Sequence, residues 1–349
     1  MTVDNLTIGE QPVPRRAVLK SVGVGLGIGA SLLQEFDLAQ AQTPLAASAI
    51  WSAEYWAKKG DVPLYLFRKR LGAPKAGEPA RPVLFLVHGS SNSSRTSYDL
   101  TVPGKGEYSM MNVFAGYGYD VWTMDHDGYG KSGNSGNNSD FASGVEDLKA
   151  AVPVVLRETG GQKLHFYGTS SGGIRAACYA QGEPEHVDRL MLSAFTYKGN
   201  GAAEIARRRK RIDALRANPR RKRDAAMIRS IFTRDGHPSS YDPGVAEAMI
   251  TDEMKFGDSV PSGTYLDMAA NLPVVDPTKV TSPVLMVRGE WDGNSTNDDL
   301  LDFFRQLPNG DRQFAILPRV AHSAGFSNNR HLLWYAVKNF LDEPAPVAI

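Results

Sequence analysis

The sequence predicts an α/β protein in which a mostly parallel central sheet is flanked by helices and carries a helical insertion. Two observations support this prediction. Short apolar runs bounded by turn residues alternate with longer stretches of helical periodicity, which is typical of parallel strands connected by helices. Residues 196–281 lie between two such runs and contain no strand–helix unit. Because ordinary connections are several-fold shorter, we interpret this segment as a mostly helical cap.

The composition is that of a globular chain that can bury a full-sized core. The 349 residues include 42% apolar residues, 39 Lys and Arg, and 38 Asp and Glu. Because the formal net charge is only +1, no field of the whole chain attracts nucleic acid, and we expect no nucleic-acid partner. The single cysteine, Cys178, cannot form an internal disulfide or supply a structural zinc site alone.

Residues 1–41 have the pattern of an export signal. Arg15 and Arg16 precede fourteen uncharged residues, 21–34, which are too few and too rich in glycine for a membrane-spanning helix. Ala-Gln-Ala at residues 39–41 matches a signal-peptidase site. The arginine pair resembles a twin-arginine signal, so we expect a periplasmic or secreted protein that begins near Gln42. An ordinary secretory signal and an uncleaved membrane anchor are the alternatives.

Residues 42–195 form the first part of the predicted core. Residues 63–70 alternate like an early antiparallel strand, whereas 82–87 are continuously apolar, as in a strand covered on both faces. Further strands are expected at residues 119–124, 163–167 and 187–194, with a helix at 143–159.

Residues 282–349 form the second part of the core. A buried strand is expected at residues 284–287 and a last strand at 313–317, followed by a closing helix at 329–341.

Gly168-Thr169-Ser170-Ser171-Gly172 directly follows the strand at 163–167 and opens a helix. This G-x-S-x-G pattern predicts a sharp turn that holds the Ser170 hydroxyl above the sheet as a nucleophile. Ser171 is the competing nucleophile, but a pattern centred on it has Thr169 in place of the first glycine. A purely structural turn, or a cradle for phosphate, is the alternative interpretation.

A serine nucleophile needs a histidine base and an orienting carboxylate. Asp292 follows the strand at 284–287, and Glu290 is the rival acid because it lies two residues nearer that strand. His322 follows the last strand, thirty residues after Asp292. We therefore predict Ser170, Asp292 and His322 as the catalytic residues.

The oxyanion formed by serine attack needs two fixed donors. We predict the backbone N–H of Ser171, at the start of a helix, and the N–H of Ser90, in the loop after residue 87, with Ser91 next in line. Trp291, beside the acid, and Ser91 are predicted to contact the substrate.

No metal or cofactor is expected. Residues 292–296 have an Asp and an Asn two positions apart but lack the later ligands of an EF-hand loop. No glycine-rich dinucleotide motif follows an early strand.

Together these motifs resemble the α/β-hydrolase fold superfamily. The resemblance spans about residues 63–341 and includes His88-Gly89, 125–132, the 168–172 turn, 289–292, and Ala321-His322. It implies a serine hydrolase in which the run at 187–194 is the sixth strand, so the predicted cap is inserted after that strand. The cap itself resembles no particular subfamily. Many relatives carry Arg where this sequence has Asp127, which leaves open how the loop at 125–132 is braced.

The predicted cap contains a strongly basic segment. Residues 204–223 hold ten basic residues against two acidic ones. This charge indicates an anionic partner, such as an acidic substrate, a polymer or a membrane surface, or else a solvated face of a helix.

The sequence therefore predicts an exported serine hydrolase of carboxylic esters or related acyl compounds, small or polymeric. Two alternatives remain open. One is hydrolysis of a carbon–carbon bond in a β-diketone with the same triad, and the other is a non-catalytic protein that binds an anionic ligand.

Overall fold

The computed structural model of the chain describes residues 50–344. Their centre is an eight-stranded sheet with the order β1-β2-β4-β3-β5-β6-β9-β10. The first two strands run antiparallel to their neighbours, and the other pairs are parallel. The strands are β1 (Ile50–Lys59), β2 (Val62–Leu71), β3 (Val83–Val87), β4 (Asp120–Met124), β5 (Leu164–Thr169), β6 (Val187–Ser193), β9 (Val284–Gly289) and β10 (Arg312–Leu317).

These strands confirm the predicted α/β fold with its mostly parallel sheet. The structure adds β1, which the sequence analysis did not predict. β1 is an edge strand with several exposed residues and two terminal lysines, so it lacks the apolar run by which the central strands were recognised. The predicted export signal at residues 1–41 lies outside the described residues.

Helices pack on both faces of the sheet because side chains of a strand alternate between its faces. Val83, Phe85 and Val87 of β3 pack toward α3 (Phe141–Thr159) and α4 (Ser171–Gly182). Leu84 and Leu86 pack instead toward α2 (Met110–Gly116) and α11 (Arg330–Asp342). Two short segments, α1 (Ser94–Tyr98) and α10 (Asn297–Gln306), complete the core helices. The buried layers hold the strand ends in place.

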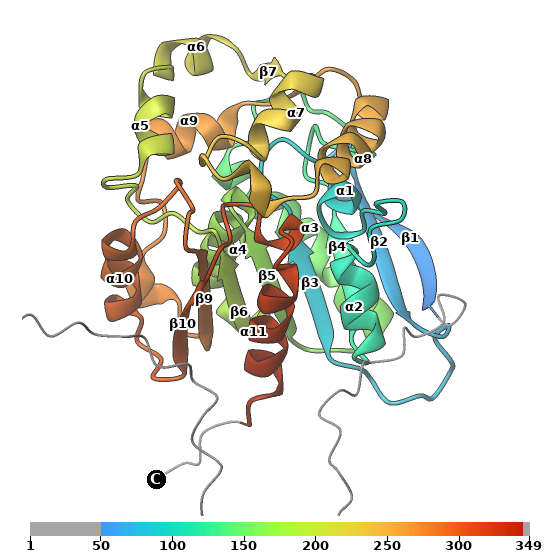
Figure 1. Cartoon of the computed structure of the whole chain (residues 1–349). Helices are drawn as coiled ribbons and strands as arrows, with labels where there is room; N and C mark the ends of the chain where they lie inside the picture. The colour runs from blue at the N-terminus through green and yellow to red at the C-terminus, as the bar shows by residue number, and fades with distance from the viewer. Residues whose placement is uncertain (1–49, 345–349) are drawn as a thin grey trace, which may run out of the picture. The chain divides into compact units, whose positions relative to one another are not determined.

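Residues 196–281 connect β6 to β9 and lie at one end of the sheet (Figure 1). They are mostly helical, but they also contain a short antiparallel strand pair that the sequence analysis did not predict. One strand of this pair consists of three basic residues, so it has no apolar pattern by which the sequence could predict it. The elements of this cap are α5 (Ala203–Arg209), α6 (Ile212–Ala217), β7 (Arg220–Lys222), α7 (Ala225–Ile231), α8 (Pro243–Glu253), β8 (Ser259–Pro261) and α9 (Gly263–Ala270).

A buried ion pair between Arg223 and Glu253 fastens the cap internally. The Glu253 carboxylate also accepts hydrogen bonds from the N–H and hydroxyl of Ser93, at 2.6 and 2.7 Å, in the loop after β3. The cap is therefore tied to the loop that borders the predicted nucleophile. No helix among residues 50–344 has the length and apolar character needed to cross a membrane.

Candidate active site

The turn from β5 to α4 holds Ser170 in an unusual backbone conformation, with φ of 55° and ψ of −127°. A side chain at Gly168 would collide with the backbone of α4, and one at Gly172 would collide with the carbonyl oxygens of Val87 and His88. Glycines are therefore required for this close approach. Such strain at a single serine is typical of functional sites.

Ser170 is joined to His322 and Asp292 by hydrogen bonds. His322 Nε2 lies 3.0 Å from Ser170 Oγ, and His322 Nδ1 lies 2.8 Å from Asp292 Oδ1. The loops after β9 and β10 bring the acid and the base to the end of the sheet at which Ser170 lies. The structure thus brings together the three residues that the sequence analysis selected.

The Asp292 carboxylate is almost fully buried, at 2% exposure. Burial would raise the pKa of this carboxyl, but His322 and the N–H of Asn294 outweigh burial and hold that pKa below its usual value. Asp292 is therefore ionised and can stabilise a positively charged imidazole.

The rival acid and the rival nucleophile lie elsewhere. Glu290 is exposed, and its carboxylate accepts a hydrogen bond from the N–H of Arg319 at 2.7 Å. The Ser171 side chain is fully buried, and its hydroxyl contacts Ser90. Neither residue makes a hydrogen bond to His322.

The two predicted oxyanion donors have different surroundings. Ser171 is the first residue of α4, where an N–H has no acceptor within the helix. The N–H of Ser90 donates to the Ser171 hydroxyl at 2.7 Å. The Ser90 hydroxyl also lies 2.6 Å from that of Thr264 in the cap. A substrate oxygen would have to replace the Ser171 hydroxyl before Ser90 could donate to it.

Of the two residues predicted to contact the substrate, one borders the cavity at Ser170 and the other does not. Ser91 borders the cavity at Ser170, and its hydroxyl accepts a hydrogen bond from Arg221 at 2.5 Å. Trp291 does not border this cavity, because its ring stacks on His237 of the cap with centroids 3.9 Å apart. The prediction for Trp291 came from its place beside Asp292 in the sequence, which does not determine the direction of its side chain.

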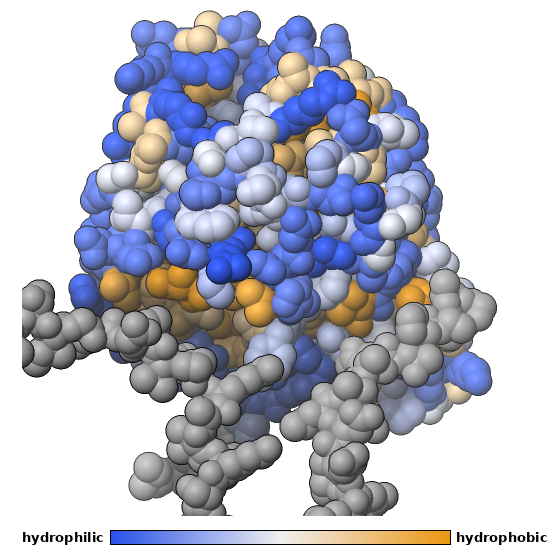
Figure 2. All heavy atoms as spheres, viewed as in Figure 1, coloured by the Kyte–Doolittle hydropathy of each residue, from blue (hydrophilic) through white to orange (hydrophobic). Residues whose placement is uncertain are grey.

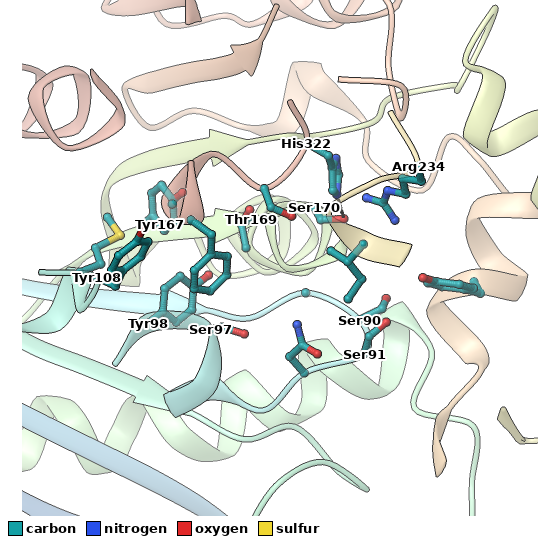
Figure 3. Close-up of a pocket in the computed structure, with 18 of the residues that line it drawn as sticks. Ser90, Ser91, Ser97, Tyr98, Tyr108, Tyr167, Thr169, Ser170, Arg234 and His322 are labelled. Carbon is teal, nitrogen blue, oxygen red and sulfur yellow. Dashed lines mark hydrogen bonds between the residues drawn. The ribbon is translucent and has the colours of Figure 1, made fainter. Parts of the chain in front are cut away.

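The cavity at Ser170 has a volume of about 80 Å³. Ser170 and His322 border it together with Arg234, and Ser90 and Ser91 lie on the nearby loop after β3 (Figure 3). The cap contributes four lining residues that the sequence analysis did not select as site residues: Arg208, Ile231, Arg234 and Tyr265. Two signals in the sequence pointed toward this group: the basic segment, which includes Arg208, and the spaced apolar and aromatic residues of the cap, which include Tyr265.

Another cap residue, Asp235, accepts a hydrogen bond from the backbone N–H of His322 at 3.0 Å. It lies 87 residues from the histidine in the sequence, and no motif marked it. Asp235 positions the loop that carries the base.

The loop after β4 is braced by a lysine of β1. Lys59 Nζ lies 3.0 Å from Asp127 and 2.5 Å from Asp147. His126 also contacts Asp147, with Nδ1 at 2.9 Å. Asp127 stands where many relatives carry Arg, and here Lys59 of the edge strand supplies the positive charge that braces the loop. The sequence did not reveal this contact because β1 lacks the apolar run of a central strand.

One group of described side chains could hold a metal ion. Glu183, Glu185 and His186 have potential ligand atoms within 4.8 Å of one another. They lie past the carboxyl end of α4, whereas Ser170 precedes the first residue of that helix. This group therefore lies apart from the Ser170 cavity.

Comparison with known proteins supports the hydrolase fold. Residues 78–326 match the family described as serine aminopeptidase, S33, which is more than half of the chain. The chain belongs to this α/β-hydrolase family. This S33 family member is also similar to Lipase 3 of Drosophila melanogaster, with 31% identity over 150 residues. The match covers 39% of the chain and 37% of the lipase, so it spans little more than a third of that relative.

Solved structures share the fold of this S33 family member. An esterase from Thermogutta terrifontis has a TM-score of 0.57 and 16% identity, over 83% of this chain and 98% of that one. The 2-hydroxy-6-oxo-6-phenylhexa-2,4-dienoate hydrolase of a Rhodococcus strain has a TM-score of 0.58 and 17% identity, over 84% and 99% of the two chains. The shared fold agrees with the family match, and the family places the chain among hydrolases.

Proposed function

We propose that this chain is a serine hydrolase that cleaves carboxylic esters or related acyl compounds. The observation that carries the proposal is the hydrogen-bonded series from Ser170 through His322 to the buried Asp292, at the edge of a cavity. The lipase and esterase names of two similar proteins agree with this bond type.

In the proposed first step, Ser170 Oγ attacks the substrate carbonyl carbon while His322 Nε2 takes the hydroxyl proton. The ionised Asp292 stabilises the resulting imidazolium and keeps the ring in the correct orientation. The carbonyl oxygen becomes an oxyanion, for which the N–H groups of Ser171 and Ser90 are the proposed donors.

Collapse of this intermediate breaks the ester bond, and the leaving alcohol takes its proton from His322. The acyl group then remains attached to Ser170 Oγ. In the second half of the reaction, His322 takes a proton from water, whose oxygen attacks the acyl carbon. Release of the acid restores the Ser170 hydroxyl. No redox partner is needed to balance these steps.

The test of this function combines labelling with substitution. A fluorophosphonate probe should label Ser170 in the intact protein and should fail to label Ser170→Ala. The same substitution should lower kcat for a p-nitrophenyl ester by several orders of magnitude, because the triad acts as a unit. An unchanged rate, or a label mapped to another serine, would overturn the proposal.

Hydrolysis of a carbon–carbon bond is the second candidate, since a protein of the same fold carries the name of a dienoate hydrolase. A β-diketone assayed beside the ester distinguishes the two. Turnover of the diketone alone would replace ester cleavage by this reaction. Binding of an anionic ligand without labelling or turnover would instead identify a non-catalytic protein.

A further inference from the structure

Three arginines of the cap surround a tyrosine at the wall of the Ser170 cavity. Arg208 of α5 and Arg221 of β7 lie over the ring of Tyr265 of α9, and Arg234, which follows α7, lines the Ser170 cavity together with Tyr265. We call these four residues the arginine cluster. The guanidinium carbons of Arg208 and Arg221 lie 4.2 and 3.9 Å from the centroid of the Tyr265 ring. Figure 3 shows Arg234 beside Ser170. The cluster therefore adjoins the proposed nucleophile.

Acidic side chains balance this charge only in part. Glu204 Oε1 lies 3.4 Å from Arg208 Nε but outside hydrogen-bonding geometry, and its other carboxylate oxygen lies 2.8 Å from Arg207. Asp235 lies 3.9 Å from Arg234, which is too long for a hydrogen bond. Within residues 50–344, the buried Nε atoms of Arg208, Arg221 and Arg234 have no hydrogen-bond acceptor. Because buried donors without acceptors are costly, the cluster is suited to a ligand that supplies acceptors.

Arg208 shows this imbalance most clearly. Its side chain is 4% exposed, and Nη1 donates to the thioether of Met268 at 3.0 Å. Burial lowers the pKa of Arg208, which indicates that its charge is poorly solvated. Glu204, Asp235 and Asp292 also act on Arg234, yet none of them accepts a hydrogen bond from the buried Nε atoms of the cluster. A ligand oxygen that accepted such a bond would therefore stabilise the cluster.

The cluster also borders a second cavity, of about 400 Å³. Arg208, Arg234 and Tyr265 line both this cavity and the smaller one at Ser170. The basic side chains of the second cavity outnumber its single acid, Glu204, and they are Arg207, Arg208, Arg211, Arg221, Lys222 and Arg234. A substrate whose reacting carbonyl lies at Ser170 could extend a charged end past the shared residues into this larger space.

We propose that the arginine cluster binds a carboxylate carried by the substrate, so that the chain prefers monoesters of dicarboxylic acids to neutral esters. This inference rests on the proposed ester hydrolysis for its kinetic consequence, although the binding of the carboxylate does not. A guanidinium presents paired N–H groups that match the two oxygens of a carboxylate. Because Ser170, Arg208 and Arg234 border the same cavity, one substrate can reach Ser170 with its carbonyl and the cluster with its carboxylate.

The kinetic test compares two esters with acyl chains of equal length, p-nitrophenyl pentanoate and mono-p-nitrophenyl glutarate. The wild-type protein should favour the glutarate ester in kcat/KM. Arg208→Met and Arg234→Met should each reduce this preference roughly ten- to hundredfold, since each removes a charged hydrogen-bond donor. Arg209→Met is the matched control, because Arg209 is exposed on the same helix as Arg208 and borders neither cavity. An unchanged preference in both cluster variants, or an equal loss in the control, would overturn the proposal.

A binding test separates the site from the chemistry. Titration of glutarate into the Ser170→Ala protein, followed by calorimetry, should show saturable binding that Arg234→Met weakens at least tenfold. Because turnover is not measured, this result stands even if Ser170 is not the nucleophile. Binding of inorganic phosphate without binding of glutarate would contradict the carboxylate assignment.

Thermal unfolding of each variant is compared with that of the wild type, which identifies any variant that fails to fold. The substitutions at Arg208 and Arg234 are independent tests, so the proposal can still be tested if one of them unfolds.

Discussion

Two acids compete for His322 in the sequence, and the geometry favours Asp292. Asp292→Asn should lower kcat by about 10⁴-fold, because it removes the charge opposite the imidazolium and favours the wrong tautomer. Glu290→Gln is the control, since the Glu290 carboxylate is exposed and contacts the backbone of Arg319. Steady-state kinetics on a p-nitrophenyl ester measures both variants. If Glu290→Gln is the more damaging change, the acid is misassigned.

Ser171 offers a second test by substitution of a single residue, because its hydroxyl accepts the hydrogen bond of the Ser90 N–H. Ser171→Ala keeps the backbone donor of residue 171 and frees that of Ser90. We expect kcat for the same ester to be retained or increased, since the substrate oxygen no longer competes with a hydroxyl. A loss as large as that of Ser170→Ala would instead indicate that Ser171 has a catalytic role.

The arginine cluster predicts an unusual titration. Burial raises the pKa of Tyr265, but Arg221, Arg208 and Arg234 outweigh burial and lower it to about 7. The Tyr265 hydroxyl is neutral when protonated and negatively charged when it loses its proton. The phenolate should therefore form as the pH rises through about 7. Its near-ultraviolet absorbance should therefore increase over that range.

Tyr265→Phe should abolish this transition. Tyr241→Phe is the control, because burial raises the pKa of Tyr241 and keeps it protonated. The same absorbance change in the Tyr265→Phe protein would show that another group titrates.

Among the secondary-structure elements, the contact between β3 and α4 depends on glycine at residue 172. A methyl group at Gly172 would collide with the carbonyl oxygens of Val87 and His88, which belong to the strand and loop beside the helix. Gly172→Ala should therefore lower the free energy of unfolding by on the order of 3 kcal/mol, because the backbone has to shift.

Gly182→Ala provides the matched control at the other end of α4. A methyl group there meets no atom within 4 Å, and alanine favours a helix more than glycine does. We expect this variant to be as stable as the wild type or slightly more stable. Denaturant unfolding of both proteins measures the difference. Equal stability of Gly172→Ala and the wild type would show that the turn tolerates a side chain.

In the folded chain, the basic side chains of residues 204–223 divide between the interior of the cap and its surface. Arg208 and Arg223 are buried, and Arg220 and Arg221 are half-buried, whereas the other six basic residues are exposed. Figure 2 shows mostly hydrophilic residues where the cap lies, with small apolar groups between them. The segment therefore combines a solvated face with inward arginines. We propose that the exposed basic residues could bind a membrane surface. Sedimentation with anionic vesicles would test this proposal.

We further propose that the chain is exported through its arginine pair. In a bacterial host, replacing Arg15 and Arg16 with Lys should leave unprocessed protein in the cytoplasm, because twin-arginine signals are read by their arginines. Fractionation and N-terminal sequencing would measure this, with a mature start near Gln42 expected for the wild type. Normal export of the variant would indicate an ordinary secretory signal, and uncleaved protein in membranes would indicate an anchor.

Local patterns in the sequence predicted much of the fold and the order of the candidate triad. Apolar runs such as residues 82–87 mark strands because both faces of the sheet are covered. The glycines at 168 and 172 mark the turn because the helix and strand approach too closely for side chains. The edge strand β1 escaped prediction, and with it the Lys59 brace of Asp127, because exposure removes the apolar signal.

The arginine cluster could not be predicted in the same way. Arg208 and Arg209 are neighbours in the sequence, yet the first is buried beside Tyr265 and the second is exposed. Trp291 likewise follows Glu290 but stacks on His237 of the cap. These outcomes depend on how short cap elements rotate against the core. Long-range packing sets that rotation, and short elements carry too few residues for their own periodicity to reveal it.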